Sequence, residues 1–146
     1  MKWLFYTTFV TLIFTLSSFG QSNYEAIITA DQLEENFLAY KIIDVSPKAA
    51  FDTLHIVGAK NLWRPDYTTS NEMIPDMNDL ESLLVELELT PSDKLVLYDH
   101  KGGCDAARLY FILAFYGHQD LFLLDGGLKS WGNKNEAIQL NPQLIT

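Results

Sequence analysis

The sequence of 146 residues has a single cysteine, Cys104, and few basic residues. One cysteine cannot form a disulfide bond within the chain, which excludes a small secreted scaffold held together by disulfides. Ten lysines and arginines against 19 acidic residues give a net charge of −9, so nucleic acid and anionic membranes are poor partners. No cluster of histidine, cysteine or acidic residues has the spacing of a metal site, and we expect no metal and no other cofactor.

The first 20 residues have the composition of a secretory signal peptide. One positive charge at Lys2 precedes an apolar stretch from Trp3 to Leu16, and small residues follow at Ser18 and Gly20. The apolar stretch is shorter than the roughly 20 residues that a membrane-spanning helix needs, so an uncleaved anchor is the weaker alternative. We therefore expect an exported protein, periplasmic or secreted, with no membrane attachment after cleavage.

The remaining length suits one domain with its own core. We divide it into a lead-in over residues 21–26, a folded domain over residues 27–132 and a polar tail over residues 133–146 without a clear element. Short apolar strands alternate with amphipathic helices in the domain, which predicts an α/β fold with a parallel sheet covered on both faces. The site of such a sheet lies at the carboxyl ends of its strands.

The individual elements are predicted from apolar periodicity and capping residues. Strands are expected over Ile27–Ile28, Lys41–Val45, part of His55–Leu62, Leu95–Tyr98 and Leu121–Leu124. Five helices are expected, over Ala30–Ala39, over Lys48–Leu54, after a cap at Asn78, from Asp105 to a C′ residue at Gly117, and over Leu128–Trp131. Thr29 and Gln32 form a capping box at the start of the first helix. Ala50, Phe51 and Leu54 are expected to point inward from the second. The long irregular connection from Trp63 to Asn78 is expected to border a site, because connections of this length are often functional.

The segment from Lys94 to Gly117 organises the chain. A strand that passes through a short glycine loop directly into a helix leaves several backbone N–H groups unpaired and pointing into the loop, which favours an anion site. The residues of this anion loop are Asp99, His100, Lys101, Gly102 and Gly103, with Arg108 from the helix. Cys104 follows the loop at the start of the helix, where the helix dipole favours a thiolate over a thiol.

Three motifs in this order resemble the rhodanese-like domain of sulfurtransferases. They are Ile42-Ile43-Asp44-Val45, His55-Ile56-Val57-Gly58-Ala59 and Leu124-Asp125-Gly126-Gly127-Leu128-Lys129-Ser130-Trp131. The resemblance implies a three-layer α/β domain with a five-stranded parallel sheet flanked by helices. In active members, a cysteine directly after the fourth core strand takes a sulfur atom from thiosulfate or 3-mercaptopyruvate as a persulfide, so a small sulfur-containing anion is the implied ligand.

The position of that cysteine holds Asp99 in this sequence. A carboxylate is no sulfur nucleophile, and it repels an anionic donor. Tyr98-Asp99 followed by Gly102 and Arg108 resembles the amino-terminal, non-catalytic domain of tandem sulfurtransferases. The resemblance thus implies a domain that works with a second rhodanese domain or a partner chain, and the chain stops about where a tandem protein would enter its linker.

Two functional alternatives remain for Cys104, one enzymatic and one redox. It could carry the sulfur in an active thiosulfate or 3-mercaptopyruvate sulfurtransferase, a role that a cysteine of a partner chain could also fill, or it could form a mixed disulfide in a redox-responsive module. In the structural alternative it is a small residue packed at the start of a helix. Its place five residues along the loop, on the rim of the anion site, favours the structural alternative.

Several other residues are given structural roles. The family pattern implies that His55 and Gly58 stabilise a turn and that Gly126 and Gly127 form another. Asp44 and Asp125 are expected to accept backbone N–H bonds at strand ends.

Three further side chains are assigned by their setting. His100 is expected to be exposed in its loop without a partner base, and His118 to lie on the surface at a helix end. Arg64, beside Trp63, is expected to contact an anion or a neighbouring domain, or to pack at the rim of the site.

Overall fold

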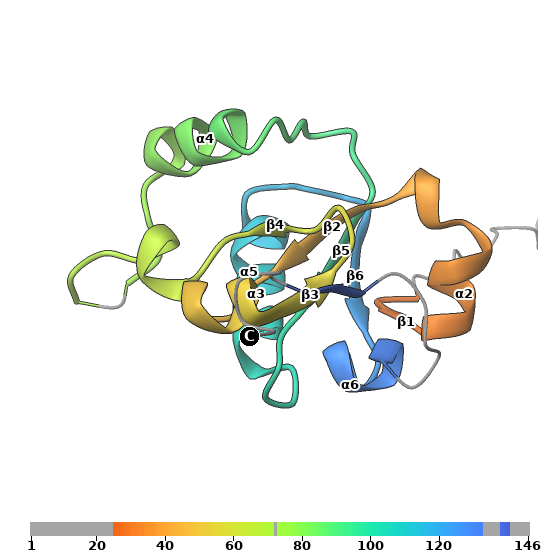
Figure 1. Ribbon diagram of the computed structural model, residues 1–146. Coiled ribbons are helices and arrows are strands. Elements are labelled where there is room, and N and C mark those ends of the chain that lie inside the picture. Colours follow the sequence, from red (N-terminus) through yellow and green to blue (C-terminus); the bar gives the residue numbers. More distant parts are fainter. Residues whose placement is uncertain (1–24, 72, 133–137, 141–146) are drawn as a thin grey trace, which may run out of the picture.

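The computed structural model describes residues 25–71, 73–132 and 138–140 (Figure 1). The strands are β1 (Ile27–Ile28), β2 (Lys41–Asp44), β3 (Leu54–Ile56), β4 (Lys60–Asn61), β5 (Leu95–Tyr98), β6 (Leu121–Leu124) and β7 (Ile138–Leu140). The α-helices are α2 (Ala30–Glu35), α3 (Lys48–Thr53), α4 (Met77–Glu86), α5 (Cys104–Phe115) and α6 (Gly127–Gly132), with 3₁₀ helices η1 (Phe37–Ala39) and η2 (Arg64–Tyr67). The expected leader over residues 1–20 lies outside the described residues.

Five of the strands form one parallel sheet in the order β1-β6-β5-β2-β4. This confirms the expected α/β fold, because every neighbouring pair is parallel and each crossover passes over a face of the sheet. β3 pairs with β7 in a separate antiparallel ribbon, with Leu54 opposite Leu140. The prediction of a tail without any element is therefore wrong for residues 138–140.

Alternate residues of the central strands point to opposite faces of the sheet, and each face carries its own core. Ile43, Leu95 and Leu97 pack with residues of α4 and α5 on one face. Ile42 and Val96 pack with residues of α2 and α6 on the other. Figure 1 shows α4 and α6 on opposite sides of the sheet. Strands buried on both faces explain why their sequences are continuously apolar.

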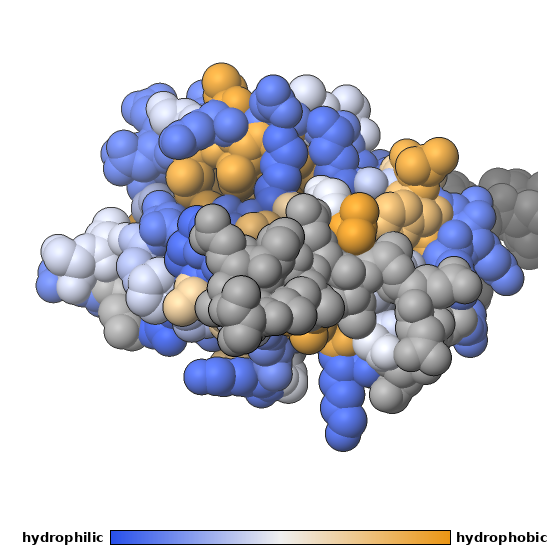
Figure 2. Space-filling model, viewed as in Figure 1, coloured by the Kyte–Doolittle hydropathy of each residue, from blue (hydrophilic) through white to orange (hydrophobic). Residues whose placement is uncertain are grey.

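The leucine stripe of α4 packs toward the sheet as expected. Leu80 is buried, and the other three leucines of the stripe, Leu83, Leu84 and Leu87, are partly buried against the same core. In the space-filling view (Figure 2), hydrophilic side chains dominate the outer side of α4, and apolar side chains gather between it and the sheet. No helix among the described residues combines the length and the apolar character that crossing a membrane requires.

Helix boundaries differ from the predicted ones by one residue at the start of α5 and of α6, and three further helices differ in other ways. The capping box of Thr29 and Gln32 begins α2 as predicted, but the α-helix ends at Glu35 and a 3₁₀ turn continues the segment. Asp76, not Asn78, begins α4, because its carboxylate accepts the N–H of Asp79 at 2.9 Å.

The short helix α3 is the third difference. It ends at Thr53, and none of its residues is fully buried. Phe51, which we predicted to point inward, is only half-buried and stacks on the His55 ring, with the centroids 3.9 Å apart. The helix therefore lies at the edge of the core and contributes less to it than its apolar residues suggested.

Candidate functional site

The loop between β5 and α5 holds an anion, and the anion is the carboxylate of Asp99. One oxygen, Oδ1, accepts the backbone N–H groups of Lys101 and Gly103, both at 2.8 Å. The other, Oδ2, accepts those of Asp105 at 3.1 Å and Ala106 at 3.4 Å. The residue is 4% exposed. The loop thus binds a carboxylate of its own chain, and two of the four donors, Asp105 and Ala106, were not in the predicted anion loop. We call the Asp99 carboxylate and its four donors the cradle.

Two glycines give the loop the backbone shape that turns these N–H groups inward. Gly102 and Gly103 have φ values of 99° and 87°, which residues other than glycine rarely adopt. Gly103 is also the N-cap of α5 and has no side chain to accept the first N–H groups of the helix. The Asp99 carboxylate supplies that acceptor, and its negative charge lies at the positive end of the helix dipole.

The Asp-Gly-Gly turn after β6 supports the cradle from behind. The N–H of Leu128 donates to the carbonyl oxygen of Asp99 at 3.2 Å. Gly127 has a φ of 56°, and a Cβ atom on it would lie 2.5 Å from that same oxygen. Only glycine therefore allows the turn to approach the loop so closely.

The role predicted for Asp125 in this turn is wrong. Asp125 is exposed, and within the described residues its carboxylate accepts no backbone N–H. Its main-chain oxygen instead accepts the Ser130 hydroxyl. The acidic residue of this turn thus contributes through its backbone.

A second, fully buried carboxylate lies beside the loop at the end of β2. Asp44 accepts the N–H of Ser46 through Oδ1 at 2.8 Å, as predicted, and contacts His100 Nε2 through Oδ2 at 3.0 Å. The Tyr98 hydroxyl accepts the N–H of Ile56 at 3.0 Å. Burial is the largest cause that raises the pKa of Tyr98 above its ordinary value, and the charge of the Asp44 carboxylate is the second. These contacts tie His100 to β2 and Tyr98 to β3, on both sides of Asp99.

The surroundings of two histidines differ from the predictions. The side chain of His100 is 18% exposed and paired with Asp44, where we expected an exposed histidine without a partner. His118 is buried rather than on the surface, and its Nε2 contacts the carbonyl oxygen of Asp93 at 2.7 Å. Both partners are distant in sequence, which is why neighbouring residues gave no sign of them.

His55 has the structural setting that the family pattern implied. Its Nδ1 contacts the carbonyl oxygen of Phe51 at 2.7 Å, at the point where α3 passes into β3. Gly58, in the turn that follows, has a φ of 79°, and nothing lies within 4 Å of a Cβ atom added to it. These two residues shape the chain between α3 and β4 and lie outside the cradle.

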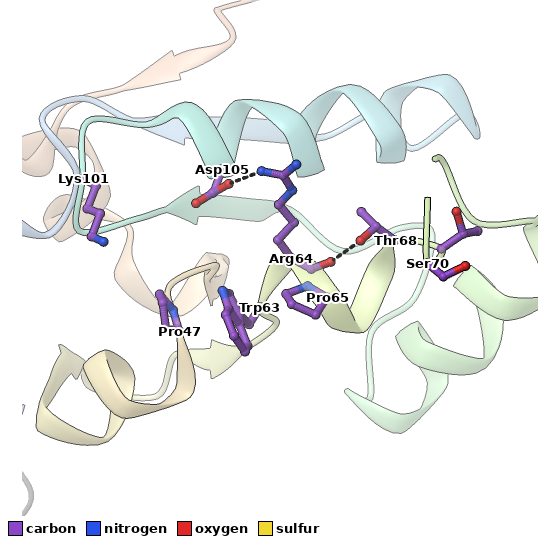
Figure 3. A pocket seen from close by; sticks show the side chains of 9 residues that line it. Pro47, Trp63, Arg64, Pro65, Thr68, Ser70, Lys101 and Asp105 are labelled. Atoms are coloured by element: carbon purple, nitrogen blue, oxygen red, sulfur yellow. Dashed lines mark hydrogen bonds and ion pairs between the residues drawn. The ribbon is translucent and has the colours of Figure 1, made fainter. Parts of the chain in front are cut away.

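A cleft of about 600 Å³ adjoins the outer side of the cradle (Figure 3). Its lining includes Trp63, Arg64, Thr68 and Ser70 from the long connection and Lys101 and Asp105 from the loop and α5. The long connection thus lines a cleft, and that this cleft is a functional site stays a prediction. Arg64 Nη1 lies 3.9 Å from Asp105 Oδ1, so the anion that Arg64 meets belongs to its own chain.

Cys104 is the first residue of α5 and carries a free, exposed thiol. Its side chain is not among the groups that bind the Asp99 carboxylate, and its exposure differs from the packed position of the structural alternative. Arg108 lies one turn farther along α5 and is half-buried. No three histidine, cysteine or acidic side chains among the described residues are grouped as metal ligands would be.

Comparison with known proteins identifies relatives in both sequence and structure. The family profile of the rhodanese-like domain matches residues 29–134. A putative thiosulfate sulfurtransferase of Mycolicibacterium smegmatis is 34% identical over 112 residues, which cover 73% of this chain and 40% of the relative. A thiosulfate sulfurtransferase of Pseudomonas aeruginosa is 33% identical over 95 residues, covering 62% of this chain and 35% of that protein.

Solved structures agree with this assignment at the level of the fold. The crystal structure of SseA from Escherichia coli, described among 3-mercaptopyruvate sulfotransferases, superposes with a TM-score of 0.72 at 21% identity, over 80% of this chain and 50% of that one. The 3-mercaptopyruvate sulfurtransferase of Leishmania major gives 0.74 at 12% identity, over 82% and 37%. The chain spans less than half the length of the curated relatives named above.

Proposed function

Because the chain belongs to the rhodanese-like domain family, we propose that it is an exported, non-catalytic member of that family. It binds a partner and carries no persulfide itself. The observation that supports this most directly is the Asp99 carboxylate, which takes up four backbone N–H groups of the loop.

Sulfur transfer from thiosulfate needs a thiolate in a site that welcomes negative charge. The thiolate attacks the outer sulfur of thiosulfate, the sulfur–sulfur bond of the donor breaks, sulfite leaves with the bonding electrons, and the enzyme keeps a persulfide. A carboxylate is a poor nucleophile toward sulfur, and Asp99 brings a negative charge to the place where the anionic donor would arrive. The hydrogen bonds of the Asp99 carboxylate also occupy the four N–H donors of the cradle.

The partner in this proposal is a second rhodanese domain or a separate chain that supplies a reactive cysteine. The curated relatives are more than twice as long as the part that this chain matches, and two of them are described as thiosulfate sulfurtransferases or putative ones. A domain of this family that lacks a nucleophile can still act as the binding half of such an assembly. The apolar leader supports the proposal of export, since one charge and a small-residue exit surround it.

One alternative keeps an enzymatic role for this chain. Cys104 is exposed at the N-terminus of α5 and is the one cysteine of the sequence. In that alternative it carries the sulfur itself or forms a mixed disulfide with a partner. Its position outside the ring of four donors disfavours it as a persulfide carrier, because the persulfide anion would lack their stabilisation.

Sulfur transfer to the purified chain tests the proposal. The protein and its Cys104→Ser and Asp99→Cys variants are incubated with thiosulfate or 3-mercaptopyruvate, and the intact mass and the release of sulfite or pyruvate are recorded. We expect the wild type and Cys104→Ser to gain no sulfur. Asp99→Cys, which places a thiol in the cradle, should gain one sulfur atom that dithiothreitol removes.

The opposite result is equally clear. A sulfur atom on the wild type that is lost in Cys104→Ser would overturn the proposal and make the rim cysteine the nucleophile. Circular dichroism of each variant shows whether its fold is intact. Export is tested separately by expressing the full sequence in a bacterial host and determining the N-terminus of the periplasmic protein, which should begin at Gln21.

A further inference from the structure

The cleft beside the cradle carries a local positive charge on an acidic protein. Its charged lining residues are Arg64, Lys101 and Asp105, two cations and one anion, whereas the whole chain has a net charge of −9. A positive cleft on an otherwise negative surface attracts anionic groups selectively, because the remaining surface repels them.

The two cations differ in how far the chain itself engages them. Arg64 Nη1 lies 3.9 Å from Asp105 Oδ1. Figure 3 shows the two side chains pointing toward each other. The Lys101 side chain is exposed, and within the described residues no carboxylate lies within ion-pair distance of its ammonium. Only its backbone N–H is used, by Asp99. Lys101 is therefore the charge in this cleft that remains available to a ligand.

The walls of the cleft suit a polypeptide. Trp63 is 37% exposed and lies with Pro47 and Pro65 along one wall (Figure 3). Tryptophan and arginine are the residue types that most often dominate the energy of protein interfaces. The hydroxyl-bearing Thr68 and Ser70 add polar groups at the rim. This combination offers an aromatic surface, a cation and a polar rim within one cleft.

We propose that this cleft binds an extended acidic segment of a partner protein, with a carboxylate on Lys101 and an apolar side chain on Trp63. The inference rests on the proposed function, since it names the surface and the chemistry through which the domain acts as a binding half. A peptide fits better than a small inorganic anion for two reasons. The N–H donors that hold small anions are taken by Asp99, and about 600 Å³ is far larger than such an anion.

Peptide titration followed by NMR tests this inference on the full chain. The probe is a blocked pentapeptide that alternates glutamate with phenylalanine, and its glutamine counterpart is the neutral control. The acidic peptide should shift the indole N–H signal of Trp63 and the amide signals of Ser70 and Lys101. The shifts should weaken as salt is added, since the contact is between charges near the surface.

Two charge reversals make the test specific. Lys101→Glu should weaken the binding of the acidic peptide about 10-fold or more, because an attraction becomes a repulsion. Lys129→Glu makes the same change of charge on α6, at a side chain outside the cleft, and should weaken it less than about 2-fold. Among the described residues, the Lys101 side chain has no hydrogen bond or ion pair, so both variants should remain folded.

Three results would overturn the inference. The Trp63 signal could stay unmoved by the acidic peptide, the glutamine peptide could bind as well, or benzoate alone could bind as tightly as the peptide, which would make the cleft a site for small organic anions. Each of these leaves the proposed function standing if the chain gains no sulfur from thiosulfate. A sulfur atom gained at Cys104 would instead remove the proposed function, whatever the peptide does.

Discussion

The cradle and the cleft lie side by side, and two residues belong to both. The backbone N–H groups of Lys101 and Asp105 point inward and bind the Asp99 carboxylate. Their side chains line the cleft on the outer side. The cradle is thus complete within the chain, whereas the cleft retains an exposed ammonium group. The comparison teaches that one loop can bind a carboxylate of its own chain through its backbone and still expose its side chains to a neighbouring cleft.

The difference between the two regions depends mainly on one residue. With cysteine at position 99, the four donors would face a sulfur atom in place of the carboxylate. With aspartate, the donors are satisfied as soon as the chain folds, and the loop becomes a structural feature that caps α5.

Removing the carboxylate should have the largest effect on stability. Asp99→Ala leaves four N–H groups without their acceptor, and we expect the free energy of unfolding to fall by about 3 kcal/mol. Asp125→Ala is the matched control, because this exposed carboxylate also follows a strand, and the loss should stay under about 0.5 kcal/mol. Urea unfolding measures both.

The same variant also tests whether the empty cradle accepts an external anion. Acetate should stabilise Asp99→Ala more than it stabilises the wild type, because it binds only where the donors are free. An equal response of the two proteins to acetate would show that the cradle does not bind external anions. A small loss of stability in Asp99→Ala would mean that water replaces the carboxylate at little cost.

The support of the cradle should be the next most sensitive point. In Gly127→Ala the new Cβ would lie 2.5 Å from the Asp99 carbonyl oxygen, at a φ of 56°. We expect a loss of about 2 to 3 kcal/mol, since strain and a backbone clash combine. Gly58→Ala separates the two causes, because its φ is 79° but nothing lies within 4 Å of the added atom. It should cost about 1 kcal/mol, and equal losses in thermal unfolding would contradict the clash.

The sequence allowed much of this edge of the sheet to be predicted. Apolar stretches gave the strands, and the glycine loop between β5 and α5 gave the anion site, because both signals are local. The identity of the anion did not follow as easily. Asp99 was recognised as a replacement for a nucleophile, but the sequence does not say that its side chain turns back to accept the N–H of Ala106, seven residues away.

The parts that could not be predicted depend on contacts between distant residues. Asp44 and His100 are 56 positions apart, and only the parallel pairing of β2 with β5 brings them together. β7 has three residues, too few for a periodic pattern, and it forms by pairing with β3. Asp76 and Asn78 are both good N-cap residues, so local preference could not decide between them.

The buried contacts behind the loop should make the protein sensitive to alkali. Burial, followed by the Asp44 carboxylate, raises the pKa of Tyr98 above 10.0, and burial together with Asp105 does the same for Tyr67. In the unfolded chain both phenols lose their protons near pH 10, while in the folded protein they keep them. The unfolded state then binds fewer protons, so the free energy of unfolding falls as pH rises above about 10.

Each tyrosine should contribute a fall of up to about 1.4 kcal/mol per pH unit, and the contribution is constant below about pH 9. Urea unfolding at several pH values, with phenolate absorbance recorded in parallel, measures it. Tyr98→Phe should remove about half of the slope. A slope that Tyr98→Phe leaves unchanged would mean that other groups cause the alkaline loss.

The smallest effect is expected where the cleft is altered and the cradle is kept. Lys101→Ala removes the exposed ammonium but retains the N–H that donates to Asp99 at 2.8 Å, so the free energy of unfolding should change by less than about 0.5 kcal/mol. Lys101→Pro removes that N–H as well and should cost about 1 kcal/mol or more. If the alanine variant were as unstable as the proline variant in urea unfolding, the lysine side chain would belong to the structure of the loop. The cradle and the cleft would then be one site, with no separate surface left for a partner.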